Sequence, residues 1–326
     1  MVSLFLSVCK LSISLCVLQI VPSRGSVRFN LIGRRILCNF TNCAGAFGRL
    51  PGVLVWSKSD RIMVILITGV SSGFGKAMAL RLAMDGHKVY GTVRRETEPL
   101  NGVTYLEADV QDEAAVASAF GRLMEAEGRV DVFVSNAGMG IGGPLEFCAV
   151  EDIGKQMDVN FMGMARWLSH VIPVMRRQGR GKIICMSSIG GLMGLPYQGA
   201  YSASKFAIEG YCQALRLELR GTGVSVTVIE PGDFSTNFTA RRKAVCPDDV
   251  RDAYPSYGRS LMSIEKDETS GLKPEYLAER ISRIVMKRRP AYSYVVATFV
   301  QRLSIFAKWL LPAPVFAWIL SLYYKL

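Results

Sequence analysis

A strand, a glycine-rich turn and a helix follow one another between residues 62 and 86, and no other feature limits the fold as strongly. Residues 62–67 form an unbroken apolar run, which is typical of a strand buried on both faces of a parallel sheet. A turn with the spacing Gly-x-x-x-Gly-x-Gly follows, and a helical pattern then runs over residues 76–85 and ends at Gly86. Such glycines let backbone N–H groups approach a pyrophosphate at the start of a helix. The arrangement therefore predicts a nucleotide-binding α/β fold.

Apolar strands and helical patterns alternate along the rest of the chain. This alternation predicts a doubly wound parallel sheet, a Rossmann fold with helices on both faces, with ligands at the carboxyl ends of the strands. Within the expected helix 151–175, Asn160 is a poor helix former, which indicates a kink, a functional role or a surface polar residue. Further strands are expected at 87–93, 103–106, 130–135, 182–186, 224–230 and 291–296, and further helices at 114–127, 201–220 and 274–289.

Composition excludes several classes of protein. Half of the 326 residues are hydrophobic, enough for a full core, so the chain is not disordered. The net charge is +12, but the basic excess is concentrated in residues 1–62, and the remainder has no basic stripe with interleaved aromatics. Nucleic acid is therefore not an expected partner. The eight cysteines form no Cys-x-x-Cys pair or Cys/His cluster, so we expect no metal site, no disulfide framework and a reducing, cytoplasmic compartment.

The two ends differ from the middle, and three domains are expected: a leader (1–62), a catalytic domain (63–296) and an apolar C-terminal helical extension (297–326). The first 21 residues are mostly apolar but lack a basic n-region and a clear cleavage site. A signal peptide, a short anchor and a true start at Met63 all fit this pattern. Residues 22–62 show no sustained period, which predicts a poorly structured leader.

The C-terminal extension is the second unusual end. Residues 310–324 are almost wholly apolar but are interrupted by Pro312 and Pro314, so the run is too short to span a bilayer cleanly. A helical hairpin over the substrate cavity or a subunit contact is one interpretation. Peripheral association with a membrane, with Lys308 and Lys325 reaching toward the headgroups, is the other.

Residues 187–205 carry the candidate chemistry. Tyr201 and Lys205 are four residues apart, so on a helix they lie on one face, and Ser188 precedes the tyrosine by thirteen positions. An ammonium beside a phenol favours the phenolate form. Together with a bound cofactor, the lysine would therefore lower the pKa of the tyrosine below its usual value of about 10. The alternative is an amphipathic helix start with a solvated lysine.

The second strand ends in Arg94-Arg95, where an NAD-binding fold places an acidic residue for the ribose 2′-hydroxyl. Arginine suits a 2′-phosphate by charge and by its fork of donors. The alternative is a pair of solvated surface arginines. The pattern favours NADP(H) over NAD(H). The third strand ends near Asp109-Val110, where a carboxylate could accept from the adenine amine.

Taken together, these motifs resemble the short-chain dehydrogenase/reductase superfamily in its classical subdivision. Segments 90–95, 190–197 and 203–210 look most like the 17β-hydroxysteroid and retinol dehydrogenase branch. The matching motifs come in family order over about residues 63–240: Thr68–Gly75, Asp109, Asn136-Ala137-Gly138, Asn160, Ser188, Tyr201 with Lys205, and Pro231-Gly232 with Thr236.

The resemblance implies a role for each matching residue. Tyr201 would be the general acid or base, Lys205 would lower its pKa and bind the nicotinamide ribose, and Ser188 would orient the substrate oxygen. Asn160 would hold a water that links Lys205 to solvent, and no metal would be needed. The expected NADP(H) contacts are Thr68, Gly69, Ser71, Ser72, Gly73, Phe74, Gly75, Arg94, Arg95, Asp109, Val110, Asn136, Ala137, Gly138, Tyr201, Lys205, Pro231, Gly232 and Thr236.

The resemblance also implies a function. We expect an NADP(H)-dependent oxidoreductase that interconverts a secondary alcohol and a ketone or aldehyde on a lipophilic, steroid- or retinoid-like molecule, as a homodimer or homotetramer. Alternatives are a 3-oxoacyl-type or keto-lipid reductase and a non-catalytic NADP(H)-sensing protein. Residues 238–273 would form the substrate lid. The steroid-binding members place a histidine there, and this chain has none after His170, so that contact does not carry over.

Overall fold

The structure is a computed structural model, which describes residues 62–95, 97–236, 238–245 and 250–326, and the backbone of 22–23, 26–31 and 34–39. The chain divides into two units, Met1–Trp56 and Ser57–Leu326. Three short strands of the first unit, which the sequence pattern did not predict, form an antiparallel sheet. The rest of the expected leader lies outside the described residues. The strands are β1 Pro22–Ser23, β2 Ser26–Leu31 and β3 Arg34–Asn39.

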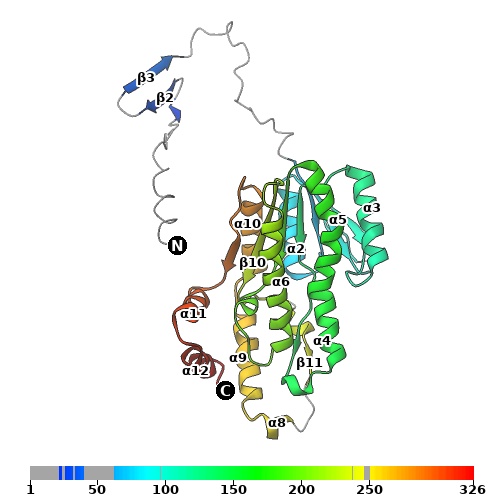
Figure 1. Ribbon diagram of the computed structural model, residues 1–326, viewed down its shortest axis with the longest axis vertical. Helices are drawn as coiled ribbons and strands as arrows, with labels where there is room; N and C mark the ends of the chain where they lie inside the picture. The colour runs from blue at the N-terminus through cyan, green and yellow to red at the C-terminus, as the bar shows by residue number, and fades with distance from the viewer. Residues whose placement is uncertain are drawn as a thin grey trace. The chain divides into compact units, whose positions relative to one another are not determined.

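The second unit is built on a seven-stranded sheet with the strand order β12-β10-β9-β7-β4-β5-β6. Helices flank this sheet (Figure 1). Each neighbouring pair of strands is parallel, which confirms the predicted doubly wound sheet. The strand order reverses beside β4, and ligands of such sheets bind at the carboxyl ends of the strands at this point. The strands are β4 Val64–Ile67, β5 Lys88–Val93, β6 Val103–Glu107, β7 Val132–Ser135, β9 Gly181–Met186, β10 Val224–Pro231 and β12 Ser293–Val296.

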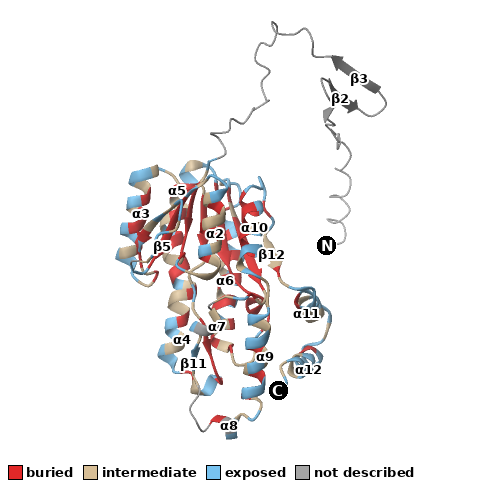
Figure 2. Cartoon of the chain, turned by 180° about the vertical axis from the view of Figure 1, so that it is seen from behind, coloured by how far each residue is buried: buried red, intermediate tan, exposed pale blue. Residues whose placement is uncertain are grey.

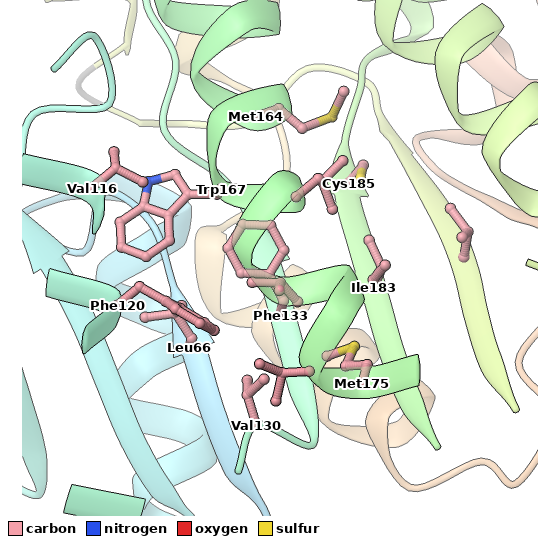
Figure 3. Packing of buried hydrophobic residues seen from close by; sticks show 14 of the residues in the cluster. Leu66, Val116, Phe120, Val130, Phe133, Met164, Trp167, Met175, Ile183 and Cys185 are labelled. Atoms are coloured by element: carbon pink, nitrogen blue, oxygen red, sulfur yellow. The ribbon is translucent and has the colours of Figure 1, made fainter. Parts of the chain in front are cut away.

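Helices cover both faces of the sheet, and the core lies between them and the strands (Figure 2). Side chains of β4 alternate between the two faces and all are buried, which explains why its sequence is an unbroken apolar run. On one face the fully buried Trp167 packs against Phe133, with ring centroids 6.1 Å apart (Figure 3). That face carries α3 Glu113–Glu127, α5 Gly163–Gln178 and α6 Gly199–Glu218, and the other carries α2 Gly73–Met84 and α10 Pro274–Val285.

The helix expected over residues 151–175 is not continuous. It consists of α4 Val150–Met157, a π-helical turn η3 Asp158–Met162, and α5. Asn160 lies inside the π turn, so the expected kink is present as a local widening of the helix. A π turn shifts the helix phase, which lets the buried Asn160 point inward.

The expected lid is more regular than its broken polar sequence suggested. Its main element is α9 Tyr257–Thr269, a 13-residue helix. The short β11 Lys243–Ala244 pairs in parallel with β8 Ile141–Gly142, so the lid is joined to the loop after β7. The remaining short elements of this region and its neighbourhood are η2 Leu145–Phe147, η4 Ile189–Gly191, α7 Phe238–Arg241 and α8 Val250–Ala253.

The C-terminal extension is helical, as expected. It contains α11 Phe299–Leu310 and α12 Ala313–Tyr323, separated at Pro312. The end of α12 contacts the lid helix, because Tyr323 Oη donates to Asp267 Oδ2 over 2.9 Å and Ser260 Oγ donates to the Tyr324 carbonyl over 2.6 Å. Among the described helices, none combines the length and apolarity that crossing a bilayer requires.

Candidate active site

Three predicted catalytic side chains meet at the carboxyl ends of β9 and β10. Ser188 follows β9, and its hydroxyl accepts from the Gly190 N–H at 3.0 Å and lies 3.5 Å from the Pro231 carbonyl oxygen. Tyr201 is in the first turn of α6, and its phenol is hydrogen-bonded to Ser188. Lys205 is one turn further on, with its ammonium nitrogen 5.6 Å from the centre of the Tyr201 ring. The hydroxyl pair can hold and protonate a carbonyl oxygen.

The electrostatics of Tyr201 differ from the expectation. Burial raises the pKa of its phenol to about 12, the Ser188 hydrogen bond opposes this rise, and the negative charge of Glu268 adds to it. Lys205 was expected to lower this pKa, but its ammonium lies over the ring and donates to the Met186 carbonyl over 2.7 Å. Desolvation of the phenolate therefore outweighs the Ser188 hydrogen bond and the charge of Arg242, which both lower this pKa. The protein alone keeps this tyrosine protonated.

Lys205 is itself strongly affected by burial. Only 6% of the residue is exposed, and desolvation lowers the pKa of its ammonium to about 8, while the charges of Cys185 and Glu209 oppose the decrease. A lysine with this pKa is mostly charged at pH 7 and loses its charge about one pH unit above neutrality. Its charge is therefore sensitive to the groups behind it.

Asn160 positions the loop after β7 and the catalytic helix together. Its Oδ1 accepts from the Met139 N–H at 2.8 Å, and its Nδ2 donates to the Met139 carbonyl at 3.0 Å and to Ser204 Oγ at 2.9 Å. Ser204 precedes Lys205 on α6. The amide therefore holds the backbone beside the site, and the water relay that the resemblance implied stays a prediction.

The glycine-rich turn is packed too closely for side chains. A Cβ on Gly75 would lie 2.1 Å from the Gly69 carbonyl oxygen, and Gly69 itself has φ +72°. Asn136 Nδ2 donates to the carbonyls of Thr68 and Gly69 at 2.8 and 3.1 Å, and Thr68 Oγ1 accepts from the N–H groups of Asn136 and Ala137. These bonds fix the ends of β4 and β7 at the point where the strand order reverses.

The residues around this turn fit a dinucleotide. The Ser72 side chain does not cap the start of α2. The N-terminal N–H groups of this helix can therefore donate to an anion, which the positive end of the helix dipole also attracts. Arg241 Nη1 reaches the Ser72 hydroxyl at 2.8 Å, which brings a cation to the place where a pyrophosphate would bind. Sequence reasoning did not single out Arg241, because it is 169 positions from Ser72.

The other expected cofactor residues lie around the same edge. Arg94 and Arg95 are exposed directly after β5, and Ser71 is exposed in the turn. Asp109 accepts from the Gln111 N–H at 3.0 Å after β6. Among the remaining residues, Phe74 packs on Phe234, Val110 lies against α5, and Gly138 lies against Asn160. Gly232 lies against Gln301 and Gly73 lies near Thr236. The Thr236 hydroxyl accepts from the Phe238 N–H.

Sequence reasoning missed a charged lining near Tyr201. Arg242 forms a bidentate ion pair with Glu268, at 3.1 and 2.7 Å, and both side chains are nearly buried. Asp233 has no ion-pair partner within the described residues; it accepts a hydrogen bond from Gln301 Nε2. Burial, together with Glu268 and Asp267, raises the pKa of Asp233 to about 7. Asp233, Arg242 and Glu268 all act electrostatically on the Tyr201 phenol.

Within the described part of the chain, no three His, Cys, Asp or Glu side chains gather in a way that could hold a metal ion. The set that does gather is a hydroxyl pair, a buried lysine and a glycine-lined turn at a sheet switch point. Comparison with known families identifies this combination: the model of the short chain dehydrogenase family matches residues 63–246.

The chain belongs to the short chain dehydrogenase family. It is 44% identical over 264 residues to a 3-ketodihydrosphingosine reductase of Bacteroides thetaiotaomicron, an alignment that covers 81% of this chain and 98% of the relative. It is 36% identical over 252 residues to human 17-beta-hydroxysteroid dehydrogenase type 1, with 71% and 76% covered. The chain is therefore an oxidoreductase of this family, and its relatives include proteins named for lipid and steroid substrates.

Solved structures of the same family agree on the fold and differ in cofactor. A serine dehydrogenase complexed with NADP+ matches with a TM-score of 0.63 and 26% identity, covering 73% of this chain and 96% of the other. A short chain dehydrogenase/reductase from Burkholderia phymatum in complex with NAD matches with a TM-score of 0.63 and 25% identity, covering 76% and 91%. Members of the family thus bind a nicotinamide cofactor, with the 2′-phosphate in the first structure and without it in the second.

Proposed function

We propose that this short chain dehydrogenase is an NADPH-dependent reductase of a long-chain keto lipid that carries an amino group beside the ketone. The keto-lipid alternative from the sequence is preferred here to a steroid or retinoid. The relative that is matched over nearly its whole length is named for such a keto lipid, 3-ketodihydrosphingosine. In that compound, an ammonium group is attached to the carbon next to the ketone.

The observation that carries this proposal is the charged lining near Tyr201. Asp233 is a carboxyl that acts on the Tyr201 phenol and has no cation paired with it among the described residues. A steroid ring offers no charge to such a group, and burying a carboxylate without a partner is costly. An ammonium adjacent to the reacting ketone would supply the missing cation.

The chain's own residues divide the work of reduction. Ser188 would hold the ketone oxygen, and Tyr201 would donate its phenolic proton to that oxygen. When bound, the nicotinamide cofactor supplies the hydride that completes the alcohol. Asp233 would hold the ammonium, and Lys205 would favour the phenolate that remains on Tyr201 after the transfer.

The 2′-phosphate form of the cofactor is part of the same proposal. Arg94 and Arg95 are exposed at the carboxyl end of β5, where the adenosine ribose of a doubly wound fold lies. Two guanidinium groups at this place favour a phosphate over a hydroxyl. Turnover with NADPH is therefore expected to exceed turnover with NADH.

Peripheral membrane association is also proposed, since it would give access to a long-chain lipid. The α11–α12 segment is largely exposed or intermediate (Figure 2). Its exposed large apolar side chains include Phe299, Phe306, Trp309 and Trp318. Its charged side chains are basic: Arg302 and Lys325, which follows α12, are exposed, whereas the Lys308 ammonium donates to the Leu192 carbonyl. Apolar surface with basic charge suits an anionic lipid surface. A homodimer or homotetramer and a cytoplasmic location stay predictions.

A substrate panel tests the proposal. The purified full-length chain is assayed with NADPH and NADH on 3-ketodihydrosphingosine, the matched ketone without the amino group, estrone and retinal. We expect the highest kcat/KM for the amino ketone with NADPH. Asp233→Asn should lower that value by about tenfold or more and change the value for the amine-free ketone much less, because only the amino ketone loses a charged contact with its substrate ammonium. Glu218→Gln, an exposed change on α6, is the matched control.

Two results would contradict the proposal. Faster turnover of estrone or retinal than of both long-chain ketones would show that the substrate class is wrong. An equal loss on both ketones in Asp233→Asn would show that Asp233 does not contact the ammonium.

A further inference from the structure

Two buried carboxylates lie in the same layer as the catalytic lysine, one on α6 and one on β10. On β10, Val224, Val226 and Val228 alternate toward the face that carries α6, and Glu230 is the next residue in this alternation. Only 3% of Glu230 is exposed. The strand therefore directs an ionisable group into a layer that is otherwise apolar.

The facing helix contributes the second carboxylate. Glu209 follows Lys205 by one helical turn, on the side of α6 that faces the sheet, between the core residues Ile208 and Cys212. It is 5% exposed, and its negative charge acts on both Lys205 and Glu230. Lys205, Glu209 and Glu230 thus form one buried group of one cation and two acids.

Hydrogen bonding satisfies only part of this group: Ser187 bonds to Glu209 and Ser293 bonds to Glu230, and each contact lowers the pKa of its carboxyl. Among the described residues, Glu209 Oε1 and Glu230 Oε2 are buried without a hydrogen-bond partner. Two ionised carboxylates in one buried layer repel each other and lack solvation. If the two carboxyl groups share one proton, the pair carries a single negative charge, which balances the positive charge of the lysine.

We propose that Glu209 and Glu230 share one proton and together form the buried counter-charge that keeps Lys205 cationic. They are positioning residues, which act on the reaction through Lys205. The inference rests on the proposed function, because it assigns Lys205 to ketone reduction. It adds a proton-holding pair that is separate from the Asn160 side of the site.

The surroundings of the pair are consistent with this role. Burial raises the pKa of Glu209, and burial and Glu209 raise the pKa of Glu230 to about 7. The titratable groups that face the pair are Lys205 and Cys212 of α6, Cys185 of β9, and Tyr292 before β12. Lys205 is the single cation among them.

The pH dependence of reduction tests the role. Glu209→Gln keeps the shape of the side chain and removes the negative charge nearest to Lys205. Glu230 then carries the remaining negative charge, and it acts on Lys205 less than Glu209 does. The apparent pKa of the Tyr201–Lys205 pair should therefore fall, and the alkaline limb of kcat should move to lower pH by about one unit. Glu230→Gln leaves Glu209 in place and should not move that limb downward. Glu218→Gln on the exposed face of α6 is the control.

A uniform loss of activity would overturn the proposal. If the Glu209→Gln profile superimposes on the wild-type profile after scaling, the residue acts only on folding or packing. If the wild type reduces no ketone at all, the proposed function fails, and the pair is then tested without turnover.

Infrared titration provides that test. The C=O stretch of a protonated carboxyl is isolated by subtracting the spectrum of the Glu209→Gln/Glu230→Gln double variant. In the wild type this band should titrate near neutral pH, and in each single variant its midpoint should shift to lower pH, because the like charge is gone. Midpoints that are unchanged in both single variants would mean that the carboxyls titrate separately, and the proposal would be wrong.

Discussion

At the residue scale, Tyr201 shows how burial decides the direction of a proton transfer. The spacing to Lys205 suggested a lowered pKa, but burial of the phenol raises it to about 12. A phenol with this pKa is protonated throughout the physiological range and can donate to a ketone oxygen. Reduction therefore needs no prior change of its protonation state, and the reverse oxidation would need deprotonation first.

Replacement of Tyr201 by phenylalanine removes this proton donor while keeping the ring that packs on Phe238. We expect kcat for ketone reduction to fall by about 10²- to 10⁴-fold, the usual contribution of general acid catalysis. Steady-state kinetics with NADPH measure the loss. Tyr211→Phe, on the same helix against Phe161, should keep full activity. Equal activity of Tyr201→Phe and the wild type would refute the mechanism.

At the element scale, the C-terminal helices combine two contacts of opposite character. The end of α12 bonds to the lid helix α9 through Tyr323 and Tyr324, while most large side chains of α11 and α12 are exposed. The hairpin interpretation and the membrane interpretation are thus compatible. The end of the segment contacts the lid, and most of its large apolar side chains are exposed.

Membrane binding is expected to depend on the exposed tryptophans. Trp309 and Trp318 are 84% and 62% exposed, and their replacement by serine should weaken binding to anionic vesicles by about tenfold or more, since each removes a large apolar contact. Vesicle co-sedimentation measures this. Met84→Ser, which removes an apolar side chain of 83% exposure from α2, is the matched control. Equal binding of the double variant and this control would argue against a lipid-facing tail.

At the scale of the whole molecule, buried acids couple stability to pH. Glu230 has its pKa raised from 4.5 to about 7 by burial. The folded state therefore holds this proton more tightly than the unfolded chain. The stabilisation from this group is complete below pH 4.5 and is lost as the pH rises through 7.

Removal of the ionisable group should flatten this dependence. Glu230→Gln cannot ionise, so its free energy of unfolding should fall less than that of the wild type between pH 4.5 and pH 8, by up to about 3 kcal/mol. Urea unfolding at the two pH values measures the difference. Glu218→Gln should behave as the wild type does. An unchanged difference in Glu230→Gln would mean that Glu230 titrates normally in the folded state.

The sequence by itself determined the features that local pattern encodes. The apolar run at β4, the glycine-rich turn and the strand–helix alternation predicted the doubly wound sheet. A strand buried on both faces must be apolar throughout, and a close backbone approach requires glycine, so both features are visible in a short stretch of sequence. The Tyr201–Lys205 spacing predicted a shared helix face for the same reason.

Tertiary structure decided what depends on contacts between distant segments. The π turn around Asn160, the charged lining of Asp233, Arg242 and Glu268, and the pairing of Glu209 with Glu230 join side chains from different elements. Only the packing of α6, β10 and α9 shows which acids are buried together. Burial then sets their charge, because desolvation depends on surroundings that no short stretch of sequence contains.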